Sequence, residues 1–85
     1  VSVVAVRGAD GATVSYPVAF NRHARHILDS TLVPAPIGPL LTMEARERAV
    51  AIAGALGYVG VLTVEFFLTE GGELLVNELA PRPHN

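Results

Sequence analysis

Runs of alternating or continuous apolar residues predict two pairs of β-strands, one pair at each end of the chain. Residues 1–7 and 13–19 are rich in valine and flank an Asp-Gly dipeptide, which is typical of a tight hairpin turn. Residues 59–69 and 73–80 repeat this arrangement around a Gly-Gly dipeptide. The pattern therefore predicts two β-hairpins.

A helical period replaces the strand pattern between the hairpins. Thr42 is a candidate N-cap, Glu44 and Glu47 fall in the first turns, where the helix dipole favours anions, and Gly57 is a candidate left-handed cap. We therefore expect a helix over residues 43–56. Its predicted core stripe is Ala45, Ala49, Ile52, Ala53 and Leu56.

The remaining middle part of the chain is polar and contains several prolines. Residues 20–29 are interpreted as a loop or a helical turn, and residues 30–37 as a short extended stretch. Pro34 and Pro36 confine that stretch to a sheet edge or to no ladder at all. The order hairpin, loop, helix, hairpin predicts an α+β fold, with an antiparallel sheet of two hairpins and one main helix packed on it.

Composition changes this picture in one respect. The chain has 85 residues, of which 51% are hydrophobic and only 16% charged, against about 25% charged in an average protein. A chain this short and this apolar would leave apolar side chains on its surface. This composition indicates that other parts of a larger protein cover them. The first residue already lies inside an apparent strand, and we expect residues 1–85 to be a single fragment truncated at both ends.

Several classes of protein are excluded. All six basic residues other than histidine are arginines, they form no stripe, and the net charge is −2, which argues against a nucleic-acid surface. The chain has no cysteine, so disulfides and thiolate metal sites are excluded. No apolar run reaches the length of about 18 residues that a membrane span needs, and a cytoplasmic protein is the default expectation.

Two glutamates of the second hairpin are the first candidates for chemistry. If Gly71-Gly72 is a two-residue turn, Glu70 pairs with Glu73. Each residue before the turn then faces the residue that lies equally far after it. Glu78 then faces Glu65, and their Cβ atoms are about 4.5–5.5 Å apart. A three-residue turn would shift the register and move Glu78 to the other face.

Direct opposition of two carboxylates is unfavourable, so it needs compensation. A shared proton or a bound cation would provide it, and magnesium typically binds one or two carboxylates together with substrate phosphates. Alternatively, both glutamates lie on a wetted face and ordinary solvation is sufficient. Arg82 has the same parity as Glu78 and would lie beyond the pair on that face, if the strand continues past Pro81.

The other face of this hairpin is predicted to be core, interrupted by one amide. Asn77 would lie there opposite Phe66, and Val76 would face Phe67 on the glutamate face. A buried amide needs partners, so Asn77 either bonds the backbone or reaches a ligand. The predicted core residues are Leu62, Val64, Phe66, Leu68, Leu75 and Leu79.

Several stretches, which together cover essentially the whole chain, resemble the 5-(carboxyamino)imidazole ribonucleotide synthases, a family of ATP-grasp carboxylases. The most specific of them is the C-terminal run from Leu75 to Asn85, Leu-Val-Asn-Glu-Leu-Ala-Pro-Arg-Pro-His-Asn. The others are Gly57-Tyr58-Val59-Gly60-Val61, Val64-Glu65-Phe66-Phe67, Tyr16-Pro17-Val18, Asn21-Arg22-His23 and His26-Ile27-Leu28-Asp29.

The resemblance implies a fold, a reaction and a set of partners. The chain would be the C-terminal subdomain of an ATP-grasp fold. In this family ATP phosphorylates bicarbonate to carboxyphosphate, and the carboxyl group then passes to aminoimidazole ribonucleotide in purine biosynthesis. The implied cofactors are ATP and Mg²⁺, and the implied partners are the two substrates, the rest of the parent chain and a second copy in a homodimer.

The resemblance also implies roles for individual residues. Glu65 and Glu78 resemble the magnesium ligands, and Asn77 and Glu78 resemble a pair at the nucleotide. His23 resembles a histidine near that nucleotide, although a solvated loop histidine is an equally open interpretation. Three C-terminal residues resemble those that meet the bicarbonate-derived group and the ribonucleotide: Arg82, His84 and Asn85. A surface ion-pair partner at Arg82 and a simple chain-end residue at His84 are the alternatives.

Departures from the family pattern leave other functions open. Phe20 stands where an acidic or polar residue is expected before Asn21, and the phosphate-gripping lysines, the glycine-rich loop and the adenine-binding segment are absent. We therefore expect these 85 residues to be inactive alone. One alternative is another ATP-grasp enzyme, such as the formate-dependent glycinamide ribonucleotide transformylase. A second is a non-catalytic α+β interaction module.

Overall fold

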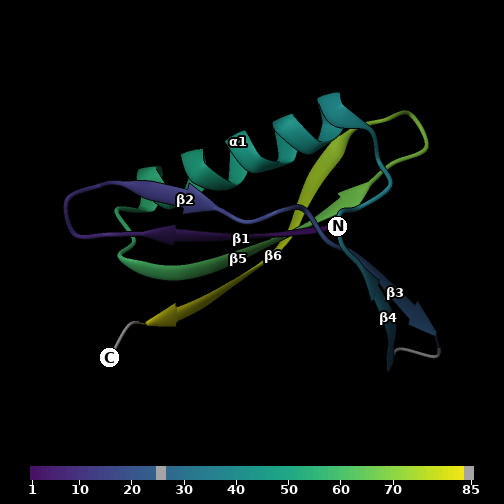
Figure 1. Cartoon of the computed structure of the whole chain (residues 1–85), viewed down its shortest axis with the longest axis horizontal. Helices are drawn as coiled ribbons and strands as arrows, with labels where there is room; N and C mark the ends of the chain where they lie inside the picture. Colours follow the sequence, from purple (N-terminus) through teal and green to yellow (C-terminus); the bar gives the residue numbers. More distant parts are fainter. Residues whose placement is uncertain (25–26, 84–85) are drawn as a thin grey trace.

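The computed structural model describes residues 1–24 and 27–83, with one helix lying across one face of an antiparallel sheet (Figure 1). The strands of that sheet are ordered β2-β1-β5-β6, and β3 and β4 form a second, two-stranded sheet. The elements are β1 (Ser2–Arg7), β2 (Thr13–Ser15), β3 (Phe20–Ala24), β4 (Ile27–Leu32), α1 (Pro39–Leu56), β5 (Gly60–Leu68) and β6 (Leu74–Pro83).

The two predicted hairpins are present and join into a single sheet. β1 pairs with β2 and β5 pairs with β6, and an antiparallel ladder between β1 and β5 connects the two hairpins. Alternate residues of β1 and β5 point toward α1 and are buried, among them Val3, Val64 and Phe66. The α+β class and the sheet of two hairpins under one helix are confirmed.

The helix begins four residues earlier than predicted. Gly38 is its N-cap, at a positive φ of 84°, and Pro39 occupies the first helical position, where its fixed φ and missing N–H are tolerated. Thr42 lies inside the helix and donates its hydroxyl to the Gly38 carbonyl at 2.7 Å, so its prediction as N-cap is wrong. The end is as predicted, because Gly57 adopts a left-handed conformation with φ 60°.

Small side chains line the face of α1 that meets the sheet. The buried helix residues are Ala45, Ala49 and Ala53, spaced four apart. Methyl groups at this spacing let the helix pack close to the strands. Leu56, predicted on the same stripe, is the last helical residue and is exposed.

The polar segment 20–29 was predicted as a loop, and this prediction is wrong. β3 and β4 form an antiparallel pair with a register shift between Arg22 and His23, and the pair projects away from the helix-covered sheet (Figure 1). A two-stranded ribbon without a covering helix needs no apolar alternation, so its strands leave no clear sequence signal. The prolines after β4 lie outside any ladder, as expected.

The edge strand β6 accounts for much of the exposed apolar surface. α1 packs against β1, β2 and β5, so the helix-side residues Leu68, Val76 and Leu79 are more than a third exposed. Leu75 points to the opposite face, which no helix covers among the described residues, and is also exposed. The core assignments of Leu68, Leu75 and Leu79 were therefore wrong.

No helix within residues 1–24 and 27–83 has the length and apolar character needed to cross a membrane.

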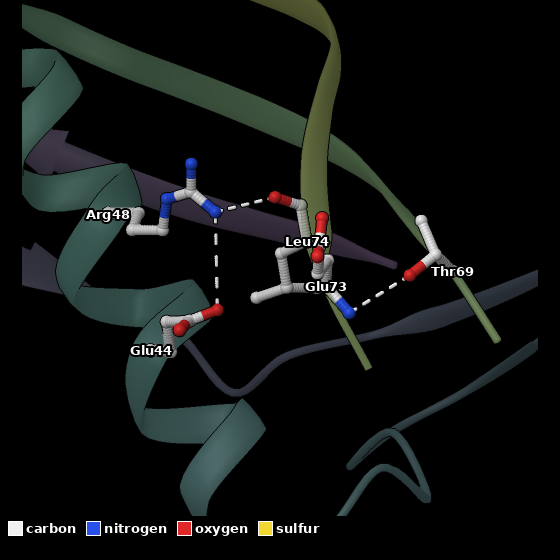
Figure 2. Close-up of polar contacts among 5 residues, drawn as sticks. All are labelled: Glu44, Arg48, Thr69, Glu73 and Leu74. Carbon is white, nitrogen blue, oxygen red and sulfur yellow. Dashed lines mark hydrogen bonds and ion pairs between the residues drawn. The ribbon is translucent and has the colours of Figure 1, made fainter. Parts of the chain in front are cut away.

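One arginine ties the helix to the second hairpin (Figure 2). Arg48 donates from Nη1 to the carbonyl oxygen of Leu74 at 2.6 Å, and the same nitrogen lies 4.0 Å from Glu44 Oε2. Its guanidinium also lies over the ring of Phe66, 5.9 Å from the centroid. Arg48 thereby fixes the start of β6 against α1.

Replacing this arginine should loosen the hairpin. We expect Arg48→Met to lower the free energy of unfolding by about 1–2 kcal/mol, because the Leu74 carbonyl loses a charged donor. Urea unfolding would measure the change. Glu44→Gln is the matched control: it removes only an exposed ion pair and should cost less than about 0.5 kcal/mol. Equal losses in the two variants would contradict the assigned role of the Leu74 bond.

Candidate carboxylate site

The turn between β5 and β6 contains three residues, not two. The N–H of Thr69 donates to the Glu73 carbonyl at 2.9 Å, and the N–H of Gly72 donates to the Thr69 carbonyl at 3.0 Å. Gly72 has a φ of 84°, which suits the left-handed position of a three-residue hairpin loop. The Thr69 hydroxyl also accepts the N–H of Glu73 at 3.0 Å (Figure 2). The predicted two-residue turn is therefore wrong.

A β-bulge in β6 restores the predicted opposition of the glutamates. Near the turn Phe66 pairs with Val76, so the prediction that Val76 faces Phe67 is wrong. The register then shifts between Phe66 and Glu65, and Glu65 pairs with Glu78. The extra residue that produces the shift is Asn77. If Asn77 instead paired regularly with Glu65, without the register shift, the three-residue turn would place Glu78 opposite Val64, on the face covered by α1.

The bulge also brings an amide to the carboxylates. Asn77 donates from Nδ2 to Glu65 Oε1 at 3.4 Å, and its side chain is exposed. The sequence placed Asn77 on the core face, bonded either to the backbone or to a ligand. That placement fails because two residues of β6, Asn77 and Glu78, lie against the single residue Glu65.

The carboxylates share the face of the sheet opposite α1 with residues of the neighbouring strands. Ser2 of β1 pairs with Glu65, so Ser2, Glu65 and Glu78 are adjacent across three strands. β6 continues through Pro81, and Arg82 pairs with Val61. Arg82 is therefore on the same face as Glu78, as predicted, and about 13 Å further along the strand.

The charge of the two glutamates is not balanced by an arginine among the described side chains. Glu65 is half-buried and Glu78 is exposed, so water solvates both in part. No cluster of three or more histidine, cysteine or acidic residues occurs in the described part of the chain.

A polar contact that the sequence did not reveal links this face to the β3–β4 hairpin. Asn21 donates from Nδ2 to Ser2 Oγ at 2.9 Å, and Thr31 donates from Oγ1 to Asn21 Oδ1 at 3.3 Å. Residues so far apart in the sequence give no signal of this contact beyond their polar character. Phe20 packs partly buried against the core, so the unexpected phenylalanine has a structural role.

The other candidate residues are only partly placed. The backbone of His23 lies in β3, opposite Leu28 of β4, directly after the register shift. His84 and Asn85 lie outside the described residues. The structure therefore brings together Glu65, Glu78 and Asn77 and puts Arg82 on their face.

Comparison with known proteins gives one consistent result. A model of the ATP-grasp domain matches residues 1–85. The N5-carboxyaminoimidazole ribonucleotide synthase of Bacillus subtilis (strain 168) is 50% identical over 84 residues, which are 99% of this chain and 22% of that protein. The synthase of Vibrio parahaemolyticus is 49% identical over 86 residues, again 22% of its length.

Solved structures agree with these relatives. An ADP complex of an N5-carboxyaminoimidazole ribonucleotide synthetase superimposes with a TM-score of 0.91 at 46% identity, over 99% of this chain and 22% of that one. The synthetase from Thermus thermophilus gives a TM-score of 0.85 at 45% identity, over 98% of this chain and 23% of that one. The chain thus spans less than a quarter of the length of each of these four proteins.

Proposed function

This chain belongs to the ATP-grasp family, and on that premise we propose that it is part of an ATP-dependent carboxylase acting on aminoimidazole ribonucleotide in purine biosynthesis. The proposed reaction uses ATP and bicarbonate to form carboxyphosphate, from which the carboxyl group is transferred. The opposed pair Glu65 and Glu78 is the observation that carries this proposal, since the chain is 50% identical to a named synthase over the segment containing it.

The donor set fits Mg²⁺. Two carboxylates lie in direct opposition on an open face, without an arginine between them among the described side chains, and hard divalent cations prefer such oxygen ligands. Glu65 and Glu78 would hold the ion. When bound, Mg²⁺ supplies neutralisation of negative charge on the phosphates. Asn77 orients one of the two ligands through its bond to Glu65 Oε1.

The remaining residues would handle the nucleotide and the substrates. We assign Asn77 and His23 to the nucleotide side, with Glu78 shared between nucleotide and metal. Arg82 presents a planar guanidinium on the carboxylate face, where it suits a carboxylate or a phosphate. His84, which can donate a hydrogen bond or transfer a proton near neutral pH, and Asn85 are assigned to the bicarbonate-derived group and the ribonucleotide.

ADP release by the full-length protein tests the reaction. We expect release to depend on both bicarbonate and aminoimidazole ribonucleotide, and not on formate with glycinamide ribonucleotide. The opposite dependence would establish the formate-dependent transformylase alternative. If neither substrate pair stimulates release and Mg-ADP does not stabilise the protein, the non-catalytic interaction module is the better description.

We also propose that the 85 residues are a segment of a larger protein. Residues 1–85 would be one fragment of an ATP-grasp domain that lacks part of the nucleotide site, within a cytoplasmic, homodimeric full-length protein. We therefore expect no ATP hydrolysis by the isolated 85 residues. Bicarbonate-dependent hydrolysis by this fragment would contradict the assignment, and light scattering of the full-length protein tests the dimer.

A further inference from the structure

Ser2 is the closest neighbour of Glu65 on β1. The amino group and carbonyl of Val1 bond the carbonyl and N–H of Phe66, and the N–H and carbonyl of Ser2 bond Ala19 on the other side. Ser2 and Glu65 are therefore a non-hydrogen-bonded pair, the kind in which antiparallel side chains approach most closely. Their Cβ atoms are expected about 4.5–5.5 Å apart, on the face opposite α1.

Two hydrogen bonds in series connect the Ser2 hydroxyl to side chains of the second sheet. Thr31 Oγ1 donates to Asn21 Oδ1, and Asn21 Nδ2 donates to Ser2 Oγ at 2.9 Å. Because Oγ accepts the Asn21 proton, its own proton is directed to a different acceptor. The Glu65 carboxylate lies on the adjacent strand and on the same face, although the described Ser2 and Glu65 side chains are not hydrogen-bonded to each other in this structure.

We propose that Ser2 and Asn21 are positioning residues for the Glu65 carboxylate, and that Asn21 acts through Ser2. Asn77 approaches Glu65 from β6, and in this proposal the Ser2 hydroxyl, which faces Glu65 across the β1–β5 ladder, turns to the carboxylate from the β1 side when the metal is bound. The hydrogen-bonded series Thr31–Asn21–Ser2 thus couples the β3–β4 hairpin to the proposed metal ligand Glu65. Hydrogen-bonded partners of ligating carboxylates commonly change metal affinity by 10–100-fold. This inference rests on the proposed function.

Metal binding by the full-length protein tests the inference without turnover. Mn²⁺ serves as the probe in the presence of ADP, and free Mn²⁺ is measured by electron paramagnetic resonance. We expect Ser2→Ala and Asn21→Ala each to weaken Mn²⁺ binding about 10-fold or more. The double variant should be no weaker than Ser2→Ala alone, because Asn21 acts through the hydroxyl that is already missing.

Two further variants separate positioning from folding. Ser2→Thr keeps the hydroxyl on a strand-favouring residue and should bind Mn²⁺ as the wild type does. Thr13→Val removes a hydroxyl that bonds the Gly11 carbonyl in the distant β1–β2 turn, and should leave binding unchanged. Melting temperatures without ligand, close to wild type for Ser2→Ala, show that the fold persists.

Failure of the positioning role and failure of the proposed function give different results. If the wild type binds no Mn²⁺ with ADP, the proposed function fails. If the wild type binds it and Glu65→Gln does not, while Ser2→Ala binds normally, only the positioning role is overturned. Additive losses in the Ser2→Ala, Asn21→Ala double variant would show that Asn21 acts independently of Ser2, and would overturn the coupling.

Discussion

Glu65→Gln and Glu78→Gln should each remove most of the stabilisation that Mg-ADP gives to the full-length protein. At a ligand concentration a hundredfold above the Kd, this stabilisation is about 2.7 kcal/mol in the wild type. A neutral amide is a poor magnesium ligand, whereas the backbone register that pairs the two positions is unaffected. Thermal melts with and without Mg-ADP measure the difference.

Without ligand, the same two substitutions should not lower the melting temperature. Two carboxylates in direct opposition repel each other, so either substitution should leave the melting temperature without ligand unchanged or raise it. Glu73→Gln is the matched control, because it makes the same charge change in the same hairpin, at the residue that follows the turn. A Mg-ADP response that survives in both site variants would refute the metal assignment.

Phe66→Ala should destabilise the fold more than any other single change considered. Phe66 is 2% exposed, is among the largest fully buried side chains, and packs against the alanine face of α1. Its truncation leaves a cavity in close-packed surroundings, and we expect a loss of about 3–5 kcal/mol. Denaturant unfolding of the two proteins under identical conditions gives this value.

The adjacent residue offers a control of identical chemistry. Phe67 is 58% exposed on the opposite face of β5, so Phe67→Ala should lower the free energy of unfolding by much less. Alternation of faces along the strand is the sole difference between the two substitutions. Comparable losses at both positions would mean that the face opposite α1 is also packed in the intact protein.

The fold was predictable where local chemistry decides it. Gly57 ends the helix because glycine readily adopts a positive φ, and apolar runs around Asp-Gly and Gly-Gly form the two hairpins. The strands β3 and β4 were missed because their segment carries no apolar alternation. The start of α1 was missed because Thr42 matches an N-cap by residue type, while Gly38 and Pro39 provide the actual start.

The site was predictable in its main contact, but not in how that contact arises. Glu65 and Glu78 face each other as expected, through a three-residue turn and a compensating bulge instead of a two-residue turn. Turn length is decided by the conformations of Gly71 and Gly72, and the sequence permits both lengths. The contact between Asn21 and Ser2 depends on how two sheets meet, which no local pattern encodes.

The extra residue at Asn77 has a consequence for how this hairpin tolerates change. Loss of one residue between the hairpin tip and Glu78 would convert the bulge into a regular ladder, with Glu78 still opposite Glu65. The opposition of the two acids would therefore survive the loss of one residue at the tip. The bulge at Asn77 thus allows the tip of the hairpin to be shortened by one residue while the spacing of the two acids is preserved.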